Sequence, residues 1–71
     1  MSNLIPIEPT VQNIARIKTI FEGNNRLERA TRGEITIQSQ QEEDTLISLG
    51  QQYQELISKF DVGPFLPYLN R

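Results

Sequence analysis

Residues 39–64, SQQEEDTLISLGQQYQELISKFDVGP, decide the fold of this chain. Apolar side chains recur there at spacings of three and four residues, which is the pattern of one helix face. Ser39, with Glu42 three residues later, matches the capping box that begins many helices, and Gly63-Pro64 is typical of a helix end. The stretch predicts a helix over 40–60, about 32 Å long. Its apolar seam consists of Leu46, Leu49, Tyr53, Leu56 and Phe60.

A shorter helix is predicted over residues 10–22, about 20 Å long. Thr10 is a suitable N-cap, and Gly23 followed by two asparagines predicts a stop. Residues 1–9 contain two prolines, which disfavour a helix, so we expect an extended arm. The apolar face of this shorter helix is formed by Val11, Ile14, Ile17 and Phe21.

Residues 24–38 allow two interpretations. The pairs Glu22–Arg26 and Glu28–Arg32 have the i,i+4 spacing that favours a helical turn, which a strand around residues 35–37 would follow. Alternatively, residues 26–30 and 34–38 form a β-hairpin with its turn at Thr31–Gly33. The sequence does not choose between a loop with a short strand and a hairpin.

The predicted fold is therefore a single domain over 1–71, mainly α, in which two helices form a hairpin around a short irregular or β segment. An α+β fold with the order α-β-β-α is the alternative. The shorter helix covers only part of the seam, and a chain of 71 residues has little stability to spare. We expect either the apolar tail, residues 61–71, or a second copy to cover the remainder, and we favour a homodimer.

The residue types exclude several classes of site. Histidine and cysteine are absent, so the chain has neither disulfides nor zinc ligands of the Cys/His type. The four glycines are dispersed and form no phosphate-binding loop. We predict no catalytic residue, cofactor or metal and no enzymatic activity. The chain lacks an apolar run long enough to span a membrane and a signal-peptide pattern, so we expect a cytoplasmic protein with no membrane partner.

Two functions are compatible with the sequence. The first is a protein–protein interaction module or regulator, whose core or interface contains the seam residues and whose tail contributes Phe65 and Tyr68. The alternative is a small dimeric nucleic-acid-binding regulator that contacts polyanions through Arg26, Arg29 and Arg32. The net charge of −2 and the interspersed glutamates disfavour this alternative. The acidic run at 42–44 is interpreted as favourable charge at a helix N-terminus.

Overall fold

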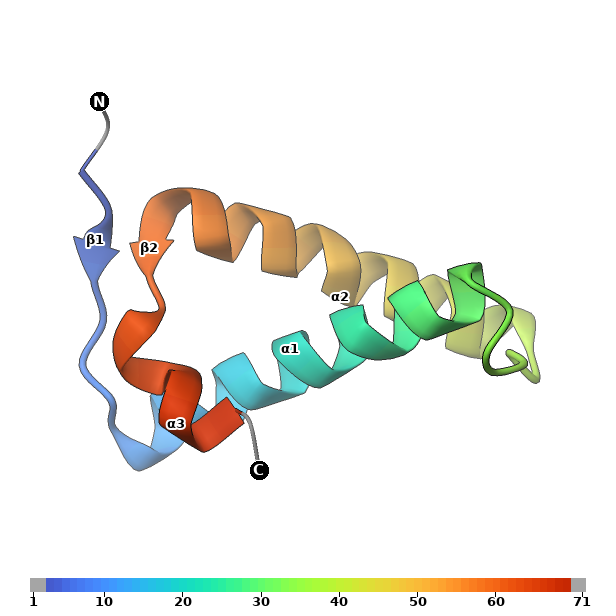
Figure 1. Cartoon of the computed structure of the whole chain (residues 1–71), viewed down its shortest axis with the longest axis horizontal. Helices are drawn as coiled ribbons and strands as arrows, with labels where there is room; N and C mark the ends of the chain where they lie inside the picture. The colour runs from blue at the N-terminus through green and yellow to red at the C-terminus, as the bar shows by residue number, and fades with distance from the viewer. Residues whose placement is uncertain (1–2, 70–71) are drawn as a thin grey trace.

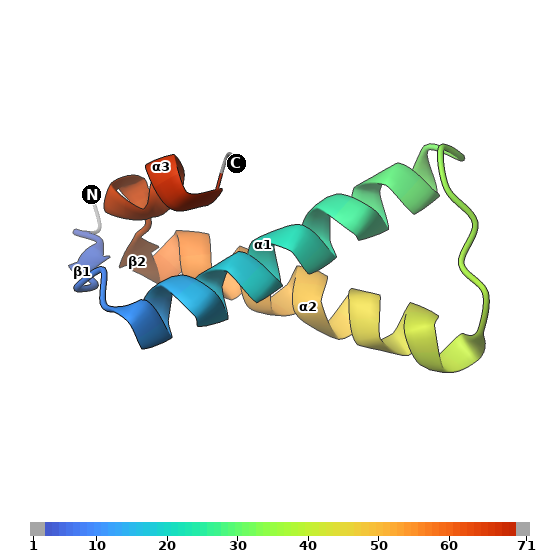
Figure 2. The same ribbon diagram turned by 90° about the horizontal axis from the view of Figure 1, so that it is seen from below.

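A computed structural model describes residues 3–69, and its two long helices form an antiparallel hairpin (Figure 1). A loop of residues 32–39 joins them, and the molecule measures 36 × 28 × 19 Å. Figure 2 shows that the two long helices cross and then separate toward this loop. The remaining elements gather at the opposite end of the hairpin. In chain order the elements are β1 (Ile5–Pro6), α1 (Val11–Thr31), α2 (Gln40–Lys59), β2 (Phe60–Asp61), the 3₁₀ helix η1 (Gly63–Phe65) and α3 (Leu66–Leu69).

Helix α1 begins as predicted but continues well beyond residue 22. The Thr10 hydroxyl accepts a hydrogen bond of 3.2 Å from the Asn13 N–H, which confirms the N-cap. The predicted stop at Gly23 is wrong, because Gly23 and Asn24 are buried inside the helix. Their burial against α2 makes the helical conformation more favourable than the local stop signal suggests. The helix ends instead before Gly33, whose φ of 80° suits glycine.

The segment between the helices contains no strand among its described residues 32–39. The helical part of the first interpretation is correct, since residues 24–31 belong to α1. The hairpin over 26–38 and the α-β-β-α order are wrong, because residues 26–30 are helical and leave 34–38 without a strand partner. The chain's strand pair is formed elsewhere, by β1 and β2, which run parallel with Ile5 opposite Phe60.

Helix α2 matches its prediction closely. The Ser39 hydroxyl accepts a hydrogen bond of 3.1 Å from the Glu42 N–H. The helix ends at Lys59, ahead of the predicted Gly63-Pro64 stop, because Phe60 adopts an extended conformation and pairs with β1. The expected extended arm therefore contains a two-residue strand, β1, which pairs with β2 directly after α2. Residues 1–2 of that arm and residues 70–71 of the tail lie outside the described part of the chain.

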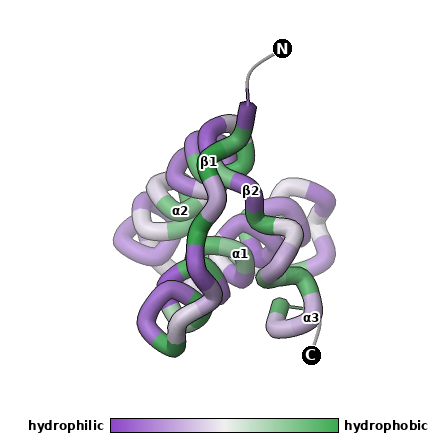
Figure 3. Tube along the Cα trace, turned by 90° about the vertical axis from the view of Figure 1, so that its left-hand side faces the viewer, coloured by the Kyte–Doolittle hydropathy of each residue, from purple (hydrophilic) through white to green (hydrophobic). Residues whose placement is uncertain are grey.

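The tail folds back onto the helices and completes the core. Phe65 is fully buried, with 0% of its surface exposed, and packs with Ile17 and Leu69. Ile7, Phe21 and Leu56 surround this cluster. Figure 3 views the hairpin from the end that carries β1 and shows α3 to one side of α1. The prediction of a mainly α fold is confirmed, with the core at the end of the hairpin where the strands lie.

In the described residues, 3–69, no helix has both the length and the apolar character needed to cross a membrane.

Candidate interaction surfaces

The seam of α2 lies against α1. Leu46 is buried, and the other four seam residues are half-buried. Leu49 packs at Gly23, and the ring of Tyr53 meets Phe21 edge-on at a centroid distance of 6.0 Å. The periodicity of α2 therefore identified the face that packs within the chain.

The predicted length mismatch between the two helices does not exist. Helix α1 has 21 residues and α2 has 20, so the two helices are nearly equal in length. The mismatch was the reason for expecting a second copy over the seam, and that reason is removed. The homodimer stays a prediction that needs a different physical basis.

The tail divides its apolar residues between the core and the surface. Phe65 and Leu69 are buried within the chain, whereas Leu66 is 46% exposed and Tyr68 is 42% exposed. Of the two predicted tail contacts, only Tyr68 is therefore on the surface. Phe65 instead fills the space that the tail was expected to close.

Exposed apolar side chains gather at the end of the hairpin that carries the strands. Seven large apolar residues are exposed among the described residues, including Ile47 and Ile57 on α2. The other five come from β1 and the residue before it, from α3 and from the first residue of α1, and these elements lie at one end of the molecule (Figure 1). We call this surface the apolar end; it consists of Leu4, Ile5, Val11, Leu66 and Tyr68.

A groove of about 390 Å³ runs between the first half of α1 and the second half of α2. Its floor is apolar and includes Ile17 and Ile20, which are almost completely buried. Its walls are polar, with Arg16 on the α1 side and Glu55 on the α2 side. The remaining floor residues are Ile7, Leu56 and Phe60, and the remaining wall residues are Asn13, Gln52 and Lys59.

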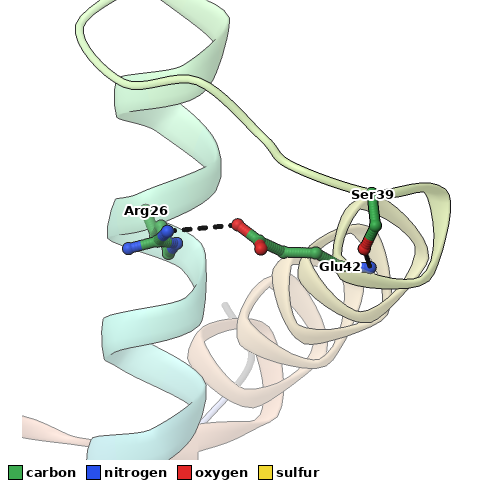
Figure 4. A network of polar contacts seen from close by, with 3 residues as sticks. All are labelled: Arg26, Ser39 and Glu42. Atoms are coloured by element: carbon green, nitrogen blue, oxygen red, sulfur yellow. Dashed lines mark hydrogen bonds and ion pairs between the residues drawn. The ribbon is translucent and has the colours of Figure 1, made fainter.

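The three arginines proposed for polyanion contact lie at the end of α1 and just after it. Arg26 donates to Glu42 of α2 at 3.1 Å (Figure 4), and Arg32 pairs with Glu34 at 2.7 Å. Neither makes the predicted i,i+4 pair within α1. Two of the three positive charges are thus balanced by carboxylates close by, and Arg29 is exposed.

Two of the three residues in the acidic run at the start of α2, Glu42 and Asp44, make contacts within the chain. The Glu42 carboxylate accepts from Arg26 instead of completing the capping box, and the Asp44 carboxylate accepts from the Gln40 side-chain amide at 3.0 Å. Residues 3–69 contain no group of three or more acidic, histidine or cysteine side chains arranged to hold a metal ion.

Sequence reasoning missed the helix crossing and the groove beside it. The crossing places Gly23 against Leu49 and Gly50 against Leu27. The signal was present, because Ile20, Gly23 and Leu27 continue the spacings of three and four residues past the apparent stop. The groove depends on how two helices pack, which no spacing within one helix reports.

Comparisons with known proteins found no protein family, no curated protein and no solved structure that this chain matches.

Proposed function

We propose that this protein is a non-enzymatic module that binds a partner protein through its apolar end. The observation that carries the proposal is the gathering there of five of the seven exposed large apolar side chains. Monomeric proteins expose single apolar residues routinely, but an accumulation at one place is typical of an interaction site. Tyr68 supports this assignment, because tyrosine is enriched in protein interfaces.

The energetics agree with such a role. Complete burial of one large apolar side chain contributes roughly 1.5–3 kcal/mol. Leu66 and Tyr68 are each less than half exposed, so together they supply a few kcal/mol on binding. Association costs roughly 4–15 kcal/mol, so a stable complex also requires contacts from Leu4, Ile5 and Val11 of the apolar end.

The other function classes receive less support. The proposal assigns no catalytic residue and no metal site. The nucleic-acid alternative is weakened by the pairing of Arg26 and Arg32 with carboxylates. It is not the function we propose.

The test compares proteins captured from the native host by the tagged full chain and by the variant Leu66→Asp/Tyr68→Asp. Leu66 is 46% exposed and Tyr68 is 42% exposed, and circular dichroism checks that the variant keeps its helicity. We expect the wild type to recover specific proteins that the variant loses. A recovered protein is then purified and titrated against both chains, with an expected loss in affinity of about tenfold or more.

Ile47→Asp is the matched control. Ile47 is 41% exposed, like the two tail residues, but lies on the first half of α2 away from the apolar end. It should bind the recovered protein as the wild type does. Equal binding by the wild type and the double variant would contradict the proposal.

A further inference from the structure

We infer that the groove between α1 and α2 is the interface for a second copy of this chain, which packs there to form a four-helix dimer. The inference adds a specific partner to the proposed binding function and uses a different surface from the apolar end. Unlike the homodimer predicted from the sequence, this dimer does not depend on an uncovered seam of α2. It rests on the exposed area, the groove floor and the charges of the groove walls.

The chain is less compact than a self-contained domain of its length. Its radius of gyration is 13.2 Å, whereas a compact domain of this length has about 11 Å. It exposes 5386 Å², against about 4500 Å² for a compact monomer of 8.2 kDa. Part of that excess belongs to the exposed loop 32–39, so the remainder corresponds to an interface smaller than the standard of roughly 800 Å² per partner.

The groove floor supplies the apolar centre that such an interface needs. Ile17 and Leu56 line the groove and also belong to the core cluster, so a chain packed there would extend the existing core. Ile20 and Phe60 continue the apolar floor along the groove. Polar side chains rise on both walls, which gives the apolar centre and polar rim of a protein interface.

The walls are complementary to each other under two-fold symmetry. Arg16 is the sixth residue of α1 and Glu55 is the fifth from the end of α2, so in the antiparallel hairpin they lie at similar heights on opposite walls. A two-fold axis parallel to the helices places α1 of one copy over α2 of the other and leaves these heights unchanged. Each Arg16 then faces Glu55 of the other copy. Glu55 already lies 3.6 Å from Lys59, so it would be flanked by two cations.

The charges of the groove walls also favour a second copy of the chain, rather than a strongly charged partner, as the ligand of the groove. The walls carry both signs, with Arg16 and Lys59 against Glu55. A highly acidic or highly basic ligand would be repelled by one of these groups. In a dimer, Arg16 of each copy meets Glu55 of the other copy, so each wall faces a residue of opposite charge.

Sedimentation equilibrium of the full chain tests the inference, from about 5 to about 200 µM. We expect the mass to rise with concentration to twice the chain mass of 8.2 kDa. Arg16→Glu and Glu55→Arg should each weaken the dimer by about tenfold or more. The double variant Arg16→Glu/Glu55→Arg should return to within about threefold of the wild type, because the pair is restored in reverse.

Arg29→Glu is the control, since it reverses an exposed α1 cation outside the groove and should leave the dimer unchanged. All three substituted positions are on the surface, and circular dichroism checks that each of the four variants is folded. A monomer at every concentration would overturn the inference, and so would a dimer that neither single reversal weakens. The two proposals can fail separately. If the chain is monomeric but Leu66→Asp/Tyr68→Asp still abolishes capture of the partner protein, this inference is overturned and the proposed function stands.

Discussion

At the scale of single residues, Gly23 has the largest effect on how the two long helices approach. A Cβ at this position would overlap the Leu49 Cδ1 atom and lie 2.7 Å from the Leu49 Cβ. The Leu49 Cβ is fixed to the α2 backbone, so relief requires the helices to move apart. Gly50 is different, because its nearest neighbour is Cδ2 of Leu27 at 2.8 Å, the end of a flexible side chain.

This difference predicts that the same substitution destabilises the chain at Gly23 but has little effect at Gly50. Gly23→Ala should lower the free energy of unfolding by about 1–3 kcal/mol, the usual cost of overpacking. Gly50→Ala should be within about 1 kcal/mol of the wild type, because the gain in helix propensity offsets a small shift of Leu27. Urea unfolding followed by circular dichroism measures both variants. If Gly23→Ala were the more stable of the two, the crossing described here would be incorrect.

At the scale of elements, both long helices begin at capped residues. Thr10 and Ser39 each accept a hydrogen bond from the backbone N–H three residues later. Helix α2 gains a second contact at the same turn, because Glu42 reaches across to Arg26 of α1. The N-terminus of α2 is therefore joined both to the loop and to the other helix.

Removal of the Ser39 cap should destabilise the chain. Ser39→Ala leaves the Glu42 N–H without its acceptor and should lower the free energy of unfolding by about 0.5–2 kcal/mol. Ser39→Asp should restore most of this loss, because aspartate also accepts the bond and favours the positive end of the helix dipole. Thermal melts of both variants provide the measurement. Gln38→Ala, at the exposed neighbouring position, is the control and should melt within a degree or two of the wild type.

At the scale of the whole molecule, the tail converts a helical hairpin into a domain with a core. Of the described residues, only Phe65 among the large side chains is fully buried, and it comes from the short 3₁₀ helix after α2. Its neighbours Ile17 and Leu69 come from α1 and α3. One small cluster therefore joins the tail, through η1 and α3, to α1, which is distant in the sequence.

Truncation of Phe65 should consequently affect the entire fold. Phe65→Ala should lower the free energy of unfolding by about 3–5 kcal/mol, which is comparable to the total stability of a domain of this size. Phe65→Leu keeps part of the packing and should remain folded with a smaller loss. Leu66→Ala, at a position that is 46% exposed, is the matched control and should change stability by less than about 1 kcal/mol. Equal urea midpoints for Phe65→Ala and Leu66→Ala would show that the tail does not complete the core in solution.

The sequence alone determined the elements whose signals are local. The capping residues Thr10 and Ser39 and the seam of α2 depend on interactions within a few residues, so spacing and residue type were sufficient to place them. Tertiary structure decided what depends on neighbours distant in sequence. Gly23 is a local signal for a helix end, but the helix continues there because Leu49 of α2 packs against it. Phe60 is extended instead of helical because it pairs with Ile5 of β1. The groove was decided at this level too, because it exists only where two helices from different parts of the chain lie side by side.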